Sequence, residues 1–309
     1  VWSLSTQYQN AADWPRPPVF ALIGGGLISS KVDVIQIVDI NNNADTTDFG
    51  NLVAATDSLA AVGSTSRVVF GGGAEDGNPI DTMQYVTVSS TGNTTDFGNL
   101  TSNRKGLAGC GSSIRGLFIG GISTSNSLKN IIDYITIATT GNASDFGDLA
   151  VAKYLIAALS SPTRGVSAGG YSNQVLNVIE YVTIDSTGNA QDFGDLTSTQ
   201  QSSAGASSTT RGVFGGGVPS QASNIIQYIT IASTGNASDF GDLTVAKSTP
   251  AGTSSHTRGI FAAGAIAGNR TKTIDVITIA STGNATDFGD CLSAIENTAG
   301  ASNGHGGIG

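Results

Sequence analysis

Apolar positions in this chain form short runs that stop at Gly-rich segments. In one representative stretch, four strand-sized pieces follow one another: "SAGASST" (203–209), "RGVFGGG" (211–217), "NIIQYITIA" (224–232) and "DFGDLTVA" (239–246). The β-branched enrichment of the third piece and the Gly-rich boundaries are strand signals. No window combines a 3.6-residue apolar period with helix caps. The pattern therefore predicts an all-β fold made of short strands.

This four-piece unit recurs about every 48 residues. Its most regular marker is Asp-Phe-Gly, which begins at Asp48, Asp96, Asp145, Asp192, Asp239 and Asp287. A second marker keeps the same spacing: an apolar run that ends in small residues, such as "VVFGGG" from Val68 and "GVFGGG" from Gly212. Self-similarity at this period indicates an array of supersecondary units, none of which can bury its own faces alone.

Four short strands per repeat are typical of β-propeller blades. A Ser-Thr-Gly-Asn turn joins the third and fourth strands, since Gly and Asn readily adopt positive φ. The repeats cover approximately 20–66, 67–114, 115–163, 164–210, 211–257 and 258–309.

Strand counting predicts how the ring closes. The first repeat lacks its own innermost strand, whereas "TAGASNGH" from Thr298 supplies a spare one. We therefore expect a six-bladed propeller in which residues 298–305 complete the blade begun by 20–52, which removes open sheet edges. A seven-bladed ring completed by residues 1–19 is the alternative. Otherwise residues 1–19, with Trp2 and Trp14, form a stiff Pro-rich lead-in that packs on the rim or anchors the domain to another subunit.

The repeats resemble the kelch family of β-propellers. The second strand ends in paired Gly, as at Gly72-Gly73, and a Tyr follows on the third strand at Tyr85, Tyr134, Tyr181 and Tyr228. An aromatic residue follows on the fourth strand, where kelch repeats usually carry Trp and this chain has Phe. The resemblance covers approximately residues 20–309 and implies a propeller domain over that range.

Composition narrows the function classes. Charged residues make up only 12% of the chain, and the formal net charge is −9. A negative field argues against a nucleic-acid backbone or an anionic membrane as partner. No window approaches the roughly 18 apolar residues of a membrane span. The two cysteines, Cys110 and Cys291, fall in different repeats, so we expect no disulfide framework.

The sequence offers no convincing catalytic or metal site, and we expect a non-enzyme without cofactor. Only His256 and His305 are present, too few for a three-His metal centre. A weak calcium hypothesis rests on the Asp or Asn three residues after each Asp-Phe-Gly Asp, which gives too few oxygens per blade. We expect the repeated Asp to tie the preceding turn through backbone amides.

Two repeated side chains are expected to be structural. The Phe is expected to fill the space between neighbouring blades, at Phe49, Phe97, Phe146, Phe193, Phe240 and Phe288. An Arg precedes the second strand in five repeats, at Arg67, Arg115, Arg164, Arg211 and Arg258. These guanidinium groups are expected to bind carbonyls or the Asp-Phe-Gly carboxylate. The alternative is a ring of positive charge that binds an anion or an acidic partner.

Recognition is expected on one face. In a propeller the loops after strands two and four share a face, and in this chain those loops differ between repeats while the loops on the other face are nearly identical. Variable loops on a rigid frame are natural binding sites. The candidate binding residues are Asp76, Tyr154, Tyr171 and Arg270.

Repeats rich in Gly, Ser, Thr and Asn, with little charge, also resemble propellers of tailed-bacteriophage virion proteins, marine and cyanophage types included. That resemblance implies a tail fibre, adhesin or surface decoration on the virion. Its partners would be other virion subunits on the N-terminal side, and a host-surface glycan or protein. The alternatives are a secreted lectin-like propeller, with sugar sites repeated in the blades, and an oxidase or glycosidase. The recurring Tyr and Phe are expected to be buried, which counts against the lectin.

Overall fold

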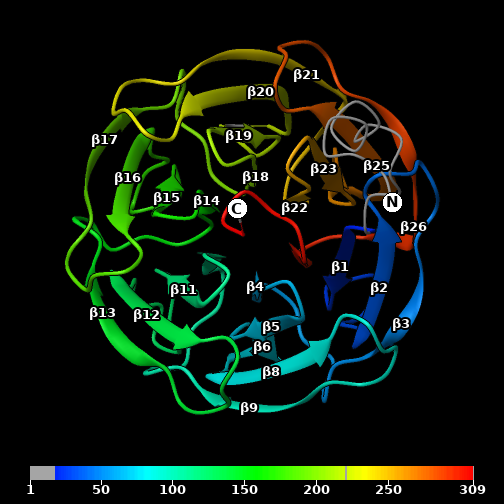
Figure 1. Ribbon diagram of the computed structural model, residues 1–309, viewed down its shortest axis with the longest axis vertical. Coiled ribbons are helices and arrows are strands. Elements are labelled where there is room, and N and C mark those ends of the chain that lie inside the picture. The colour runs from blue at the N-terminus through cyan, green and yellow to red at the C-terminus, as the bar shows by residue number, and fades with distance from the viewer. Residues whose placement is uncertain (1–17, 220, 309) are drawn as a thin grey trace, which may run out of the picture.

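The chain folds into six four-stranded antiparallel sheets arranged as the blades of a propeller (Figure 1). The structure is a computed structural model that describes residues 18–219 and 221–308. Short first strands surround a central channel, and fourth strands form the outer edge of the ring. The all-β prediction and the six-bladed prediction are both confirmed. Residues 1–17, on which the predictions for Trp2 and Trp14 fall, lie outside the described residues.

The blades share one strand order from the channel outward. Blade 1 contains β27 (Ala299–Ser302), β1 (Phe20–Gly24), β2 (Val34–Asp39) and β3 (Thr47–Asn51). Blade 2 contains β4 (Ala60–Gly63), β5 (Arg67–Gly71), β8 (Thr82–Thr87) and β9 (Thr95–Asn99), and blade 3 contains β10 (Ala108–Gly111), β11 (Arg115–Ile119), β12 (Ile131–Thr136) and β13 (Ser144–Asp148). Blade 4 contains β14 (Ala157–Ser160), β15 (Arg164–Ala168), β16 (Val178–Thr183) and β17 (Gln191–Asp195). Blade 5 contains β18 (Ala204–Ser207), β19 (Arg211–Gly215), β20 (Ser223–Thr230) and β21 (Ser238–Lys247), and blade 6 contains β22 (Ala251–Ser254), β23 (Arg258–Ala262), β25 (Asn269–Thr278) and β26 (Thr286–Ile295). Three short strands lie in loops: β6 (Ala74–Glu75), β7 (Asn78–Pro79) and β24 (Ala265–Ile266).

The last strand of the chain closes the ring. β27 pairs antiparallel with β1, from Ala21 opposite Ser302 to Gly24 opposite Ala299. Blade 1 is therefore built from both ends of the described chain, as the strand count predicts, and the seven-bladed alternative is wrong. Closure leaves no unpaired innermost strand at the seam.

The core lies between the blades as six apolar clusters. Phe97 of blade 2, for example, packs in one cluster with Ile135 and Ile137 of blade 3. Every Phe of the repeated Asp-Phe-Gly is only 2% exposed. In blades 2 to 5 this Phe also contacts the Tyr of its own third strand edge to face, as in the Tyr85–Phe97 pair with ring centroids 5.9 Å apart. Each blade thus covers the face that its neighbour could not bury alone.

The repeated turn docks on the fourth strand of the preceding blade. The backbone N–H groups of Gly141 and Ala143 donate to the carbonyls of Phe97 (2.7 Å) and Asn99 (2.8 Å). The side-chain oxygen of Asn142 accepts from the backbone N–H of Asn99 at 3.0 Å. Equivalent contacts recur at the following junctions through Asn189, Asn236 and Asn284. Each copy of the repeated sequence "STGNASDFGDL" therefore contains a turn that docks on the preceding blade and a fourth strand that receives the turn of the next blade. We call this series of docked turns and fourth strands around the ring the outer belt.

The expectation for the Asp of Asp-Phe-Gly is wrong. Asp96 and Asp145 are exposed, and their carboxylates make no hydrogen bond to any residue within 18–219 or 221–308. The Asn of the turn, one blade further on, makes the tie instead. The physical reason is that the turn leaves its own blade and leans on its neighbour, so its amides point away from the Asp.

The repeated Arg residues bridge neighbouring blades. Arg115 lies 4.5 Å from the ring centroid of Tyr134 in its own blade and donates to the carbonyl of Ile184 in the next blade at 2.7 Å. Arg67, Arg164 and Arg211 repeat both contacts. Arg258 lies over Phe288, because Val276 stands where blades 2 to 5 have Tyr. Cation–π contacts and bonds to carbonyls both hold the guanidinium in place.

The junction between blades 6 and 1 has the same contacts as the other junctions, but they are made by different residue types. The Asp290 N–H donates to the side chain of Asp45 at 2.9 Å, and the Thr46 N–H donates to the Asp290 carbonyl at 2.9 Å. Ala44 stands where five blades have the turn Gly. The outer belt is therefore continuous around the ring.

The outer belt predicts unequal costs for two similar substitutions. Gly147 and Gly188 both have positive φ, at 147° and 157°. A Cβ at Gly147 would lie 2.4 Å from the Gly188 carbonyl oxygen, whereas a Cβ at Gly188 would meet nothing within 4 Å. We expect Gly188→Ala to cost about 1 kcal/mol of unfolding free energy through backbone strain. Gly147→Ala should cost about 2 kcal/mol more, because it also separates the two blades. Denaturant titration measures both, and equal losses would contradict the docking account.

Candidate functional site

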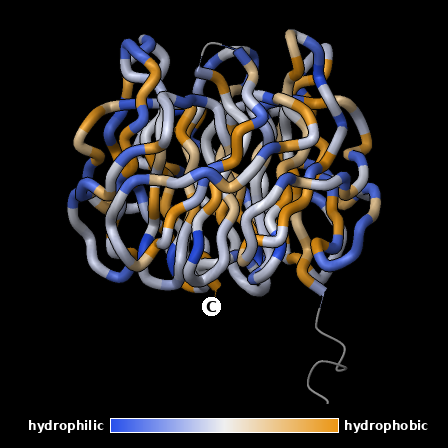
Figure 2. The backbone as a smooth tube through the Cα atoms, turned by 90° about the horizontal axis from the view of Figure 1, so that it is seen from above, coloured by the Kyte–Doolittle hydropathy of each residue, from blue (hydrophilic) through white to orange (hydrophobic). Residues whose placement is uncertain are grey.

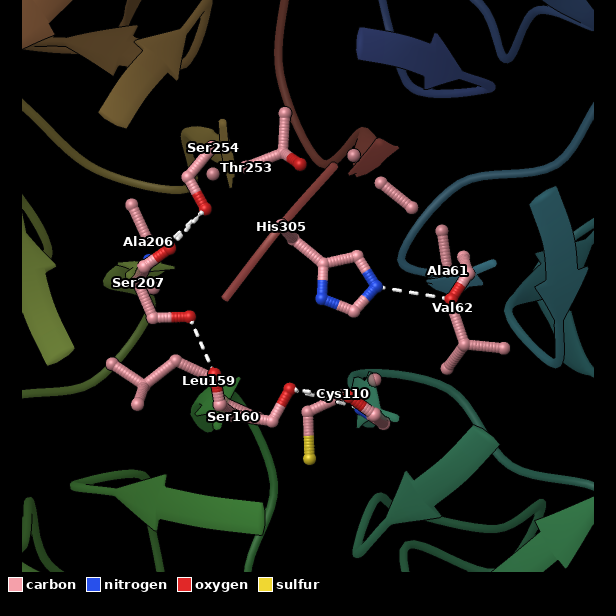
Figure 3. A pocket seen from close by; sticks show the side chains of 18 residues that line it. Ala61, Val62, Cys110, Leu159, Ser160, Ala206, Ser207, Thr253, Ser254 and His305 are labelled. Atoms are coloured by element: carbon pink, nitrogen blue, oxygen red, sulfur yellow. Dashed lines mark hydrogen bonds between the residues drawn. The ribbon is translucent and has the colours of Figure 1, made fainter. Parts of the chain in front are cut away.

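The central channel is narrow because its walls are made of small residues. Gly, Ala and Ser dominate the six innermost strands, and the cavity that these strands line has a volume of about 40 Å³ (Figure 3). That volume suits a water molecule and is far below the few hundred Å³ of a typical ligand pocket. The channel is therefore a packed axis rather than an open pore.

Serine hydroxyls link the first strands at one end of this axis. Ser160 donates to the Gly111 carbonyl (2.7 Å), and Ser207 donates to the Ser160 carbonyl (2.8 Å). Ser254 and Ser302 continue the series by donating to the carbonyls of Ser207 (2.8 Å) and Ser254 (2.6 Å). Blades 2 and 3 have Gly63 and Gly111 at this position, so the series of serine donors lacks two members.

His305 replaces one of the missing donors. Residues 303–308 cross the centre of the ring (Figure 1), and His305 Nε2 lies 3.0 Å from the Gly63 carbonyl oxygen, which a Ser at 111 would otherwise reach (Figure 3). The Gly307 N–H donates to His305 Nδ1 at 3.1 Å. Because Nδ1 accepts, the ring proton belongs on Nε2, and the imidazole is neutral. Burial lowers the pKa of His305; the bond to Gly63 opposes that shift and nearby His256 adds to it.

The thiol beside this tail is not activated. Cys110 lines the same cavity, and burial raises its pKa to about 12, so it stays protonated at neutral pH. Burial likewise raises the pKa of Cys291 to about 12. Within the described residues no group of three or more His, Cys, Asp or Glu side chains is placed to hold a metal ion.

Backbone hydrogen bonds constrict the opposite mouth of the channel. One residue per blade lies there with φ between 53° and 63°: Ser58, Gly106, Leu155, Ser202, Thr249 and Asn297. Each of the first five donates its N–H to the carbonyl of its counterpart in the preceding blade, at 2.8–2.9 Å. The cavity that these residues line has a volume of about 80 Å³. This mouth, too, is too small for most organic ligands.

The variable-loop face, meaning the loops after the second and fourth strands of each blade, surrounds that mouth. Figure 2 shows this face rising in separate lobes, while the opposite face, where the chain ends, is more even. The β6–β7 hairpin carries Asp76 at its tip in blade 2, and the β24–β25 hairpin carries Arg270 in blade 6. The loops therefore differ in shape as well as in sequence.

The structure brings together two of the four predicted binding residues. Tyr154 and Tyr171 form a β-bridge in blade 4, and their rings meet edge to face with centroids 5.8 Å apart. Asp76 is exposed, and Arg270 forms an ion pair with Glu296 at 2.8 Å. Because these residues lie on three different blades, they do not form a single pocket.

Sequence reasoning missed three buried ion pairs. These are Arg104–Asp133 (2.6 Å), Lys153–Glu180 (2.7 Å) and Lys247–Asp275 (2.8 Å), whose acids lie at equivalent places on the third strands of blades 3, 4 and 6. In blade 5 the same place holds Gln200 and Gln227, whose side chains are hydrogen bonded at 2.7 Å. A signal was present: the residue seven places after the repeated Phe is cationic in the three repeats where the residue before the next Tyr position is acidic, and Gln200 takes this place ahead of Gln227.

These pairs are structural. The carboxylate of Glu180 also accepts from the backbone N–H of Ala150 at 2.7 Å, so it fastens the fourth strand of blade 3 to blade 4. Gln84 does the same for Val53, and Gln227 for Thr197. Burial lowers the pKa of Arg104, while the carboxylate of Asp133 opposes that shift. The Gln or acidic side chain on the third strand therefore accepts a hydrogen bond from a backbone N–H of the preceding blade. Where this side chain is a carboxylate, the Lys or Arg beside it balances its buried charge.

Comparison with known proteins gives no match, either to a protein-family model or to a curated protein. No helix that could cross a membrane occurs within 18–219 and 221–308. The geometry of the described residues is therefore the basis for a functional proposal.

The ion pairs predict a rescue experiment. Lys153→Met should lower the unfolding free energy by about 3–5 kcal/mol, because it leaves the Glu180 carboxylate buried without a counter-charge. The double variant Lys153→Gln/Glu180→Gln copies the pair of blade 5 and should recover most of that loss. Denaturant titration of the three proteins checks this, and a double variant no more stable than Lys153→Met would contradict it.

The tail predicts a pH dependence of stability. The pKa of His305 is lowered from 6.5 in the folded state, so the unfolded chain binds a proton first and stability falls as pH drops below 6.5. We expect His305→Gln to lose this part of the pH dependence of Tm between pH 8 and pH 5. His256→Gln, which alters an exposed side chain, should retain it. Identical pH profiles for His305→Gln and the wild type would rule out His305 as the titrating group.

Proposed function

We propose that this chain is a non-enzymatic recognition module whose variable-loop face binds a partner. The observation that carries the proposal is the separation of constant from variable parts. The outer belt, the Arg bridges and the serine series repeat from blade to blade, whereas the β6–β7 hairpin is found in blade 2 and β24 in blade 6. A rigid frame that presents loops of different shape is suited to recognition.

The chemistry of this face supports binding of an extended partner. It offers an aromatic pair in blade 4, exposed Asp76 in blade 2 and a half-buried Arg270–Glu296 pair in blade 6. These groups point to a protein or glycan surface that contacts several blades, because no single blade gathers them. Aromatic side chains and Arg are the groups that most often dominate such interfaces.

The state of the channel residues supports the non-enzymatic reading. The proton on His305 Nε2 is already donated to a carbonyl, and the Cys110 thiol is protonated. A nucleophile paired with a free base is what hydrolytic or transfer chemistry requires.

The path of the chain supports display on a particle. β1 begins and β27 ends on the face opposite the variable loops, since Phe20 and Asn303 are hydrogen bonded to each other there. A chain attached through its N-terminal side to other virion subunits would direct the variable loops outward. Together with the resemblance to kelch-like virion propellers, this favours a tail fibre, adhesin or surface decoration of a tailed bacteriophage that contacts the host surface.

Cell binding tests the proposal. We expect the fluorescently labelled full chain to bind saturably to some strains of a bacterial panel, measured by flow cytometry. Tyr171→Ala or Asp76→Ala should weaken that binding at least tenfold, because each removes a side chain of the variable-loop face, half-buried in the case of Tyr171 and exposed in that of Asp76. The control Thr91→Ala changes an exposed residue of the opposite face and should have no effect. Absence of binding to every strain, or equal losses with Thr91→Ala, would overturn the proposal.

A further inference from the structure

A second, separate kind of site lies on the outer rim of the face opposite the variable loops. Two cavities occur there at equivalent places, one in blade 3 with a volume of about 330 Å³ and one in blade 6 with about 280 Å³. Both are lined by the end of the third strand and by the turn that follows it. A cavity that recurs at the same repeat positions is a property of the repeat.

The outer belt creates these cavities. In blade 3 the ladder between β12 and β13 stops at the pair Tyr134 and Ser144. Beyond that pair, β12 continues along β11, while the turn leaves to donate from Gly141 and Ala143 to blade 2. The two halves of the hairpin therefore part, and a hollow opens between them.

Hydroxyl groups line the hollow without being used by the protein. In blade 3 its wall contains the side chains of Thr136, Thr139, Thr140, Ser144 and Tyr134. None of these hydroxyls is hydrogen bonded to another residue within the described ranges, and all but the half-buried Tyr134 are exposed. Tyr134 lies under the Arg115 guanidinium, which fixes its ring and leaves the phenol group at the wall. The half-buried Tyr corrects the expectation that the recurring Tyr is buried, which had counted against repeated sugar sites.

The chemistry of the lining is neutral and amphiphilic. Every hydroxyl can donate and accept, the Asn142 amide adds both roles, and the phenol combines an apolar ring with a polar group. No carboxylate or Lys lines either cavity, and the Arg258 guanidinium in blade 6 is already bonded to the Ile40 carbonyl at 2.8 Å. An ion would lack a counter-charge here, whereas a ring of hydroxyl groups would find partners for each of them.

We propose that the rim cavities of blades 3 and 6 each bind one neutral sugar ring of a glycan. Their volumes lie at the lower end of the range for small-ligand pockets, which suits a monosaccharide unit. Single sites of this kind are shallow and weak, so useful affinity comes from two or more cavities engaging one polysaccharide. The site goes beyond the recognition proposed for the variable-loop face and does not depend on it.

Two blades of the same chain serve as natural controls. In blade 4, Gln191 replaces Ser144, and the Tyr181 hydroxyl donates to its side chain at 2.7 Å, so the phenol is occupied. In blade 1, Asn42 donates to Asp39 at 2.7 Å, and Asn43 donates to the Asp287 carbonyl at 3.2 Å. These side chains satisfy each other, and a sugar would have to displace them.

Ligand-observed NMR on the full chain tests the site. The probes are glucose, galactose, mannose and N-acetylglucosamine, followed by titration of the best one to obtain a Kd and a stoichiometry. We expect millimolar binding that includes the cavities of blades 3 and 6. Thr140→Val should lower the stoichiometry by one, and Thr140→Val/Thr282→Val should lower it by two, because each change removes a hydroxyl and keeps the side-chain shape. The control Thr187→Val makes the same change in blade 4 and should leave the stoichiometry unchanged.

Gain of binding gives the sharper outcome. Gln191→Ser gives blade 4 the lining of blade 3 and should raise the stoichiometry by one, while Ser144→Gln should lower it by one. Wild-type chain that binds none of the four sugars, or Thr187→Val that loses as much as Thr140→Val, would overturn the proposal. Tyr171→Ala and Asp76→Ala should leave sugar binding intact, so failure here and failure of variable-loop recognition are distinguishable.

Discussion

The docking of each turn on the preceding fourth strand is the contact on which the rest of this ring depends. It requires a residue without a side chain at the receiving strand, because the carbonyl of the docking turn occupies the place of a Cβ. Once the turn is held there, the Phe beside it is sealed between two blades and the Arg of one blade reaches the carbonyls of the next. One backbone approach thus sets the blade spacing, the apolar core and the charged bridges together. This close backbone approach accounts for the repeated sequence "STGNASDFGDL".

The same contact explains why the rim is hollow where the axis is solid. The backbone N–H groups of the turn could donate to carbonyls of their own hairpin or to carbonyls of the neighbouring blade, and they donate to the neighbouring blade. The hairpin consequently opens at its outer end, whereas Ser hydroxyls and small side chains close the space along the axis. The two cavities on the axis of the propeller therefore have volumes of only about 40 and 80 Å³. Its concave, polar features lie on the periphery, and its distinctive loops lie on one face.

Much of the fold could be predicted because a repeat multiplies weak signals. One Gly-Gly or one Phe says little, but six copies in phase indicate the strands, the blade number and the closing strand. Residue roles that depend on a neighbour in space were harder. The Asp of Asp-Phe-Gly was expected to tie its own turn, yet the turn points to another blade. His305 could not be recognised as a stand-in for a serine donor, because nothing in the sequence shows which carbonyl lies beside it. The ion pairs did have a signal, since charge at one repeat position follows opposite charge at another. The rim cavities had none, because they arise where two strands separate.

The antiparallel pairing of β1 with β27 has a mechanical consequence. Phe20 and Asn303 lie at the same end of that pair, so a force that draws the two ends of the propeller apart opens its hydrogen bonds one after another. A force between the N-terminal side and a partner on the variable-loop face instead runs along the strands and loads many bonds at once. The ring should therefore open at low force when its two ends are pulled apart, and should resist a higher force when the tension runs from one face to the other.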